Sequence, residues 1–332
     1  EKEIGGEAKD VFNPAAVVKD DRVYLLYRAE DHEGKYAGTS RVGMAVSEDG
    51  LHFQTMPEPV LYPEKDEFSI YEWEGGCEDP RIVETKDGKY FLYYTSFNGK
   101  VALLSCAESS DLVHWKKHGP IFKDTLNGKY KDLWSKSGAV VCRQEGDHFY
   151  PVKLKETYWM YWGESDIYAA TSDDLIHWTP VEFLADGADP SHSFSQHDSR
   201  CKDNDEVARV LLPIIRPRVG NYDEFLCEPG PQAILTDAGI VLIYNGKGNN
   251  PERLGGHDTM YQGGQLLIDP ENPTCLIART TRPFISPSES FELEGQVMPT
   301  CFLEGLVSFH GRYYMYYGTA DSKVAVASAP QK

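Results

Sequence analysis

The sequence predicts an all-β fold and, within that class, a five-bladed β-propeller. Three observations lead to this prediction: an aromatic-rich composition, a high content of turn residues and a fivefold internal repeat. Aromatic residues make up 12% of the 332 residues and include 20 Tyr, while Gly (29) and Pro (20) are frequent. Such a mixture is typical of short strands joined by tight turns.

The repeat is a Tyr-rich run with the composition of a strand. It occurs five times, at residues 23–27, 90–94, 158–162, 240–244 and 313–317. The last tyrosines of successive runs are separated by 67, 67, 83 and 73 residues. A unit of this length has room for four short strands, as in a propeller blade, and we expect residues 1–332 to form one domain. A β-sandwich needs only about seven strands and no fivefold repeat.

Shorter elements flank these runs in a regular order. A turn signal such as residues 87–89 precedes each run, and a strand of small residues such as 42–46 follows most of them, so each pair is expected to form a hairpin. A polar turn ending in an aromatic residue then recurs at 47–53, 109–115 and 172–178. We expect the terminal aromatic of each turn to pack against a neighbouring sheet.

The charge balance excludes several classes of partner. Lys and Arg total 33 against 52 Asp and Glu, which gives a formal net charge of -19. So acidic a surface repels nucleic-acid phosphates and anionic lipid headgroups. No apolar run of 18 residues is present, so membrane insertion is not expected. The sequence does not fix an oligomeric state.

Neither a metal nor an organic cofactor is predicted. The seven Cys are scattered and odd in number, without a CxxC pair. His192, His197 and Asp198 lie close together in the sequence but do not have a recognised ligand spacing. The chain begins at Glu1 without Met, and we expect an exported protein of the periplasm or cell surface.

The densest cluster of candidate catalytic residues is Gly-Gly-Cys-Glu-Asp-Pro-Arg at 75–81. It directly precedes an apolar run, and Pro80 favours an extended backbone at Asp79, which would fix a carboxylate at the start of a strand. An ordinary surface turn with a local ion pair is the alternative interpretation of this motif.

Two further carboxylates stand beside repeat strands. Glu164 follows the third Tyr-rich run, and Glu228 precedes the fourth. Each is unremarkable alone, but equivalent positions in a propeller would point both at one axis with Asp79. Glycoside hydrolysis uses such a pair, one carboxyl protonating the leaving oxygen and another activating water. Mutual repulsion is expected to keep the acid protonated.

Polar residues near the same strands are candidates for binding sugar hydroxyls, which require both donors and acceptors. Each of them also suits a structural ion pair. They are Asn13, Arg28, Arg41, Lys136 and Asp321.

At these residues the chain resembles glycoside hydrolase family 130, the mannoside phosphorylases and β-mannosidases. The resemblance covers nearly the whole length. It rests on Asn-Pro-Ala at 13–15, Leu-Tyr-Arg-Ala at 26–29, Ser-Arg-Val-Gly-Met-Ala at 40–45, Gly-Cys-Glu-Asp-Pro-Arg at 76–81 and Tyr-Tyr-Gly-Thr-Ala-Asp at 316–321.

The resemblance implies a five-bladed propeller with a β-mannooligosaccharide substrate. It implies that Asp79 is the general acid and delivers its proton through a hydroxyl of the bound mannose. It also implies that Asn13, Arg28, Arg41 and Asp321 hold the sugar, and Lys136 matches a lysine associated with β-1,2 linkages.

Within this family the sequence is similar to the hydrolytic branch, the β-1,2-mannosidases. Phosphorylases carry basic side chains where phosphate docks, whereas this chain has Glu164, Glu228 and Asn245 at positions that depart from that pattern. By similarity Glu164 and Glu228 flank the anomeric carbon, and either is a candidate base. An insertion at 186–205 leaves Asp198 and Glu206 as substitutes for Glu228.

We therefore expect a β-1,2-mannosidase that acts by single displacement with inversion, for which carboxyl groups stand about 6.5 to 9.5 Å apart. Three alternatives remain. One is a phosphorylase that uses residual basic residues, namely Arg143, Lys153 and Arg216. The others are a five-bladed arabinofuranosidase or xylosidase, and a glycan-binding propeller without turnover.

Overall fold

The fold is known from a computed structural model, which describes residues 9–30, 38–184 and 209–331. These residues form 24 strands and, apart from two single 3-10 turns, only two helices of four residues each, α1 (Ser69–Glu72) and α2 (Ser290–Leu293). The predicted all-β class is confirmed. None of the described helices is long and apolar enough to cross a membrane.

Three sheets follow the chain as simple antiparallel meanders. The first runs β1-β2-β3-β4, the second β5-β6-β7-β8 and the third β22-β23-β24. Their bounds are β1 (Asp10–Lys19), β2 (Arg22–Glu30), β3 (Arg41–Ser47), β4 (Gln54–Thr55), β5 (Gly76–Glu84), β6 (Tyr90–Phe97), β7 (Ala102–Ser109), β8 (Lys116–Pro120), β22 (Phe302–Phe309), β23 (Arg312–Thr319) and β24 (Lys323–Pro330).

The third and fourth repeats share one sheet of 11 strands, because β9 pairs in parallel with β18. Its path is β14-β13-β12-β9-β18-β19-β20-β21, and β10, β11 and β17 pair beside it. The separate pair β15–β16 follows the third repeat. The bounds are β9 (Ala139–Glu145), β10 (His148–Pro151), β11 (Lys153–Leu154), β12 (Thr157–Trp162), β13 (Tyr168–Ser172), β14 (Thr179–Pro180), β15 (Glu182–Leu184), β16 (Arg209–Leu211), β17 (Leu226–Pro229), β18 (Ala233–Thr236), β19 (Gly239–Asn249), β20 (Thr259–Ile268) and β21 (Leu276–Arg279).

The five Tyr-rich runs all form strands, as predicted. They are part of β2, β6, β12, β19 and β23. Each of these strands pairs antiparallel with a strand on either side. Because the third and fourth repeats are joined in one sheet, strand pairing alone does not give the number of blades.

Buried apolar side chains form five clusters, and each cluster joins two repeats. Four of them connect consecutive repeats, and the fifth connects the last repeat to the first. Strand β1 shows how: Ala15 and Val17 belong to one cluster, and Ala16 and Val18 to another. Successive residues of a strand point to opposite faces, so both faces of this sheet are buried.

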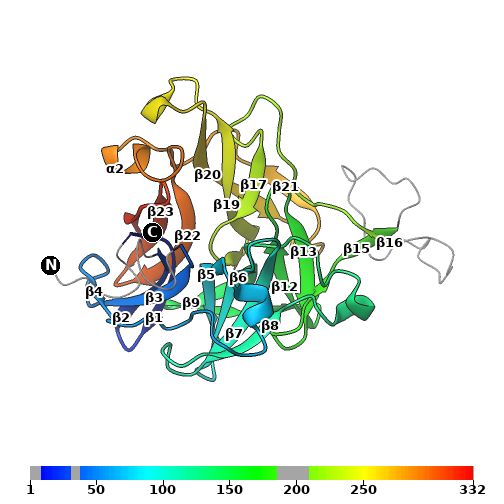
Figure 1. The fold of residues 1–332 in the computed structure, drawn as a ribbon. Coiled ribbons are helices and arrows are strands. Elements are labelled where there is room, and N and C mark those ends of the chain that lie inside the picture. The colour runs from blue at the N-terminus through cyan, green and yellow to red at the C-terminus, as the bar shows by residue number, and fades with distance from the viewer. Residues whose placement is uncertain (1–8, 31–37, 185–208, 332) are drawn as a thin grey trace.

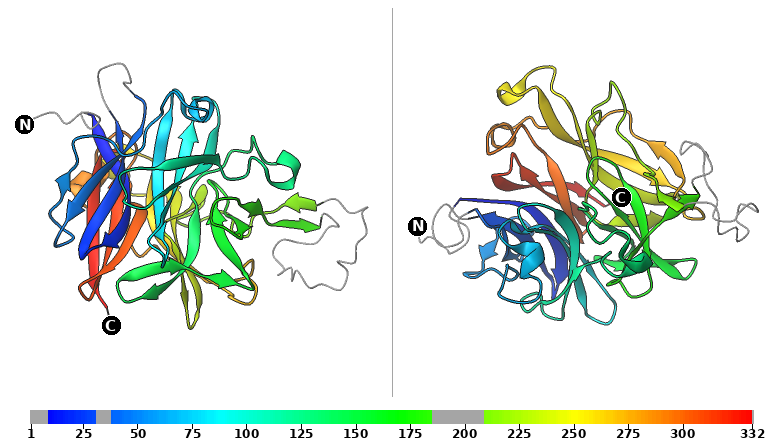
Figure 2. Two further views of the ribbon diagram at one scale, coloured as in Figure 1. Left: turned by 90° about the horizontal axis from the view of Figure 1, so that it is seen from below. Right: turned by 45° about the vertical axis from the view of Figure 1, so that its right-hand side comes forward.

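The ribbon views show the same order of neighbouring repeats. The sheets follow one another around the molecule in chain order, and the red C-terminal strands lie beside the blue N-terminal ones (Figures 1 and 2).

The three polar turns have one structure. In each, the Asp carboxylate accepts hydrogen bonds from backbone N–H groups and contacts the His ring, for example Asp174 with His177. The terminal aromatic packs against the preceding repeat: Trp178 contacts Tyr93 with ring centroids 6.0 Å apart, and Phe53 contacts Tyr316 at 5.7 Å. This expectation is confirmed.

Candidate active site

Two candidate site residues lie at bulges in the first strand of a sheet. Asn13 in β1 and Asp79 in β5 both have left-handed backbone conformations, with φ of 50° and 47°. The pairing register shifts at both places. The extended backbone that Pro80 was expected to impose on Asp79 is therefore wrong. The bulge overrides that preference and turns the buried Asp79 carboxylate towards Asn13.

The residue before this motif's cysteine has to be glycine. Gly76 has a φ of 116°, and a Cβ atom there would lie 2.2 Å from the carbonyl oxygen of Ser40. The backbones of Ser40 and Gly76 form a parallel bridge at this point. Glycine thus lets β5 approach the start of β3, which brings the Asp79 motif close to the strand that carries Arg41.

Three donors surround the Asp79 carboxylate. Asn13 Nδ2 donates to Oδ1 at 2.8 Å, Arg28 Nη1 lies 3.3 Å from the same oxygen, and Lys136 Nζ lies 3.2 Å from Oδ2. Burial alone would raise the pKa of Asp79, but Lys136, Arg28 and the Asn13 hydrogen bond together lower it below its usual range. The expectation that repulsion keeps this acid protonated is therefore wrong for the unliganded protein.

Arg28 links Asp79 to a second group of carboxylates. Its guanidinium lies 2.9 Å from Glu30 and 3.1 Å from Glu78, and Nε donates to Ser40 Oγ at 2.9 Å. Arg41 begins β3, directly after Ser40 and opposite Ala29 in the β2–β3 register. The structure thus places the Arg41 backbone next to Ser40, which accepts a hydrogen bond from Arg28.

One short segment reaches all three candidate catalytic carboxylates. Trp134 Nε1 donates to Glu164 Oε2 at 2.6 Å, Lys136 pairs with Asp79, and the Ser137 hydroxyl donates to Glu228 Oε1. Segment 134–137 precedes β9 and lies between the second and third repeats in the chain. Its three side chains bring together the residues that the sequence predicted from separate repeats.

Glu228 and Glu164 have different surroundings. Glu228 lies in β17, is buried, and has a pKa raised to about 7, mainly by burial and further by the Glu164 charge, against the lowering effect of Lys136. Glu164 follows Gly163 at the end of β12 and is only half-buried. Both carboxylates raise the pKa of Lys136, although Asp79 raises it more and burial lowers it.

Asp321 completes the predicted set. It follows β23 in a left-handed conformation, with a φ of 52°. Burial raises its pKa to about 6, while Arg28 lowers it and Asp79 raises it. These interactions place the Asp321 carboxyl near the Arg28–Asp79 pair. Asp198 and Glu206, the possible substitutes for Glu228, lie outside the described residues.

Sequence reasoning missed a buried ion pair beneath this site. Arg81 Nη1 lies 2.9 Å from Glu304 Oε1, and the same guanidinium donates to the carbonyl oxygens of Asp79, Pro229 and Gly230. Neither Glu304 oxygen accepts a well-aligned hydrogen bond from the described residues, and burial raises the pKa of Glu304 despite Arg81. A charged residue inside the apolar β22 run was the available signal.

Tyr261 in β20 was also missed. Burial raises the pKa of its hydroxyl, and the charges of Glu228 and Glu164 raise it further. The hydroxyl therefore lies near the two glutamates. No sequence pattern distinguishes this tyrosine from the other 19 in the chain.

No metal site accompanies these residues. In the part of the chain that the structure describes, no group of three or more His, Cys, Asp or Glu side chains is arranged to hold a metal ion. His192, His197 and Asp198 lie outside those residues. The chemistry that the described groups offer is proton transfer and hydrogen bonding to a polyhydroxylated ligand.

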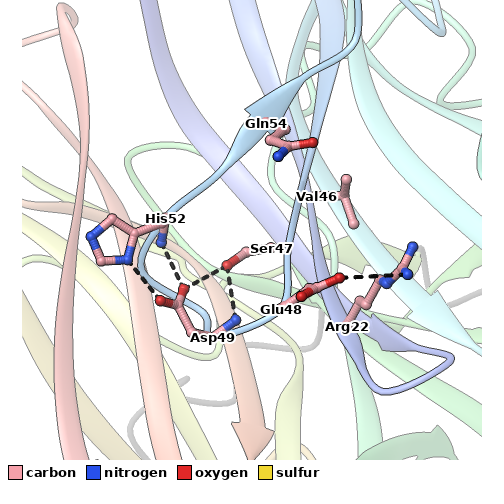
Figure 3. Close-up of a pocket in the computed structure, with 7 residues that line it drawn as sticks. All are labelled: Arg22, Val46, Ser47, Glu48, Asp49, His52 and Gln54. Carbon is pink, nitrogen blue, oxygen red and sulfur yellow. Dashed lines mark hydrogen bonds and ion pairs between the residues drawn. The ribbon is translucent and has the colours of Figure 1, made fainter.

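Two open cavities lie away from this site. One, of about 410 Å³, is lined by residues of the first polar turn together with Arg22, Val46 and Gln54 (Figure 3). The other, of about 370 Å³, lies at the second polar turn, near Trp115. In the β1–β2–β3 register, Arg22 and Ser47 are at the opposite end of the sheet from Asn13 and Arg28. We place the candidate active site at the charged cluster because that is where the converging carboxylates lie.

Comparisons with known proteins cover the whole chain. A family model described as beta-1,4-mannooligosaccharide phosphorylase matches residues 3–332. The 1,2-beta-oligomannan phosphorylase of Thermoanaerobacter sp. (strain X514) is 28% identical over 344 residues, covering 98% of this chain and 92% of that protein.

Several solved structures have a higher sequence identity to this chain. A glycosyl hydrolase from Bacteroides ovatus is 43% identical with a TM-score of 0.85, covering 99% of this chain and 87% of that one. Another structure is 40% identical with a TM-score of 0.85, covering 98% and 87%. The description of that structure says that the GH130 family of mannoside phosphorylases contains glycoside hydrolases that target beta-1,2 mannosidic linkages in Candida mannan.

Proposed function

Because the chain belongs to glycoside hydrolase family 130, we propose that it hydrolyses β-1,2-mannosidic bonds of mannooligosaccharides by a single displacement with inversion. The proposal joins the family's action on mannosides to the carboxylates of this particular site. We further propose that residues 1–332 form one five-bladed propeller domain. The five apolar clusters, which join each repeat to the next and the last to the first, support that arrangement.

The observation that carries the proposal is that Glu164 and Glu228 both accept hydrogen bonds from the segment whose Lys136 is paired with Asp79. A phosphate dianion needs cationic and donor partners, and the carboxyl groups of Glu164 and Glu228 supply no cation. Lys136 is already paired with Asp79 at 3.2 Å. A neutral water molecule, in contrast, is what a carboxylate can orient and deprotonate.

In the proposed reaction, one glutamate takes a proton from water while the water oxygen bonds to the anomeric carbon. The glycosidic C–O bond breaks on the opposite face, and Asp79 is the source of the proton for the departing oxygen. Asp79 is held ionised in the unliganded protein. A sugar hydroxyl that enters between Asp79 and Lys136 would weaken this ion pair and help Asp79 take up its proton.

Phosphorolysis is the second candidate, favoured by the phosphorylase names of the family model and of the Thermoanaerobacter relative. The basic residues that would be needed do not support it. Arg143 and Lys153 are exposed, and Lys153 lies over the Tyr158 ring, 5.0 Å from its centroid. Arg216 is exposed as well.

The deciding experiment is the initial rate on β-1,2-mannobiose with and without phosphate, following mannose and mannose 1-phosphate. We expect mannose alone, at a rate independent of phosphate. Asp79→Asn serves as the control that this site is responsible, and its rate should fall by a factor of about 10² to 10⁴.

Phosphate-dependent formation of mannose 1-phosphate would replace the hydrolase by a phosphorylase. Binding of mannobiose without any product would instead indicate a glycan-binding propeller. Turnover of arabinosides or xylosides in preference to mannosides would refute the substrate class.

A further inference from the structure

Trp134 is an unusual residue for a protein surface. Its side chain is 46% exposed, although large aromatic rings are normally buried. Its indole N–H donates to Glu164 at 2.6 Å, and Phe97 supports its ring edge-on with centroids 6.2 Å apart. The ring is thus fixed on one side by packing and on the other by a carboxylate.

The backbone on both sides of this contact is also fixed. Ser135 N donates to the Ala102 carbonyl, and the Ser135 hydroxyl accepts from Leu104 N, which fastens segment 134–137 to β7. Gly163 N donates to the Lys136 carbonyl at 2.8 Å. The residue before Glu164 is therefore tied to the same segment that carries Trp134.

A half-exposed glutamate at the end of a strand would otherwise be free to change rotamer. Catalytic groups have to be held to within about 0.5 Å. The indole N–H can only donate a hydrogen bond, so its partner has to be an acceptor such as a carboxylate oxygen. Glu228 differs because it is buried, and burial favours its neutral form although the Ser137 hydroxyl donates to it.

We propose that Trp134 is a positioning residue that holds Glu164 as the base of the reaction, while Glu228 serves as a neutral hydrogen-bonding partner at the same site. This inference rests on the proposed function and divides the roles of the two glutamates. The water oxygen bonds to the anomeric carbon, its proton passes to Glu164, and the glycosidic bond breaks. The departing oxygen receives its proton from the Asp79 side.

The first test compares Glu164→Gln with Glu228→Gln on β-1,2-mannobiose. Glutamine cannot act as a base but keeps the shape and donor capacity of a neutral carboxylic acid. We expect Glu164→Gln to lower kcat by a factor of about 10² to 10⁴ and Glu228→Gln to lower it no more than about tenfold. The reverse order, or equal losses, would overturn the division of roles.

The second test is Trp134→Phe, which removes the N–H and keeps an aromatic ring. We expect kcat to fall by a factor of about ten to 100 with little change in KM. The loss should fall on kcat because the N–H holds the carboxylate in place and does not itself bind the sugar. A purely structural role would lower the stability of the protein or raise KM without this selective loss of kcat.

Trp115→Phe is the matched control. Trp115 follows the end of β7 opposite to Ala102, and its indole N–H donates to the Leu112 carbonyl at 2.9 Å. The same chemical change there should leave kcat and KM unaltered. A Trp134→Phe variant that behaves like Trp115→Phe would refute the inference.

Failure of the proposed function is recognised separately. A wild-type enzyme that requires phosphate contradicts the hydrolase before any variant is compared. A wild-type enzyme that hydrolyses mannobiose, with variants that do not follow the expected order, contradicts only the roles of Trp134, Glu164 and Glu228.

Discussion

At the scale of single residues, the site is defined by carboxyl groups in unlike environments. Asp79 is buried between Lys136 and Arg28 and has a lowered pKa, whereas Glu228 and Asp321 are protonated more readily because burial dominates. Such separation of pKa values within one site is typical of acid–base catalysis. The sequence predicted which residues converge but not these protonation states, which depend on distances between repeats.

Glu228 gives a prediction about stability. Its pKa is about 7 in the folded protein, against an ordinary value of 4.5. Between these pH values the unfolded chain loses its proton while the folded protein keeps it, so the free energy of unfolding falls as pH rises from about 4.5 to 7. We expect Glu228→Gln to exceed the wild type by up to about 3 kcal/mol at pH 8 and to match it at pH 4.

Urea denaturation at the two pH values measures this difference. Glu48→Gln is a suitable control because Glu48 is exposed at the far end of the first sheet. An equal effect of Glu228→Gln at pH 4 and pH 8 would show that the carboxyl does not carry a raised pKa.

At the scale of elements, the first strands of three sheets share a bulge. The register shifts between Phe12 and Pro14 in β1, between Glu78 and Arg81 in β5, and between Leu303 and Gly305 in β22. A bulge leaves one residue unpaired and redirects its side chain. The sequence predicted the strands from their Tyr-rich repeats. It did not predict the bulges, because the local preference of a residue before proline gave the wrong backbone for Asp79.

Arg81 gives a prediction at this scale, since it joins β5, β17 and β22. Arg81→Met removes four contacts and leaves Glu304 buried without its cation. Breaking a buried pair on one side costs about 3–5 kcal/mol of stability. We expect the double variant Arg81→Met/Glu304→Met to recover much of this loss, as measured by denaturant unfolding.

The double variant also separates stability from positioning. If it regains stability but not kcat, the pair sets the spacing between Asp79 and the Glu228 strand. A double variant no more stable than Arg81→Met would contradict the idea that the unpaired carboxyl causes the loss.

At the scale of the whole molecule, the apolar clusters connect every repeat to its neighbours. The fivefold spacing of tyrosines predicted this, because each repeat has too little core of its own. The spacing between the third and fourth tyrosines, 83 residues, is the longest of the four. This part of the chain contains the additional strand pair β15–β16. How the third and fourth repeats merge into one sheet was not predictable, because it depends on a single parallel contact between β9 and β18.

A substitution of Trp178 tests the apolar connection between neighbouring repeats. It is fully buried in the cluster between the second and third repeats. We expect Trp178→Ala to destabilise the protein by about 3–5 kcal/mol and to keep a single unfolding transition, as followed by calorimetry. Two separate transitions would show that repeats unfold independently of their neighbours.

The polar turns at 47–53, 109–115 and 172–178 have a practical consequence. They lie at the ends of strands remote from Asp79, and their Asp and His side chains are largely exposed. A dye, an affinity handle or a solid support attached at Glu48 or Ser110 would leave the end of the sheets that carries Asn13 and Asp79 uncovered. The proposed hydrolysis of β-1,2-mannobiose should therefore be as fast with the immobilised protein as with the free protein.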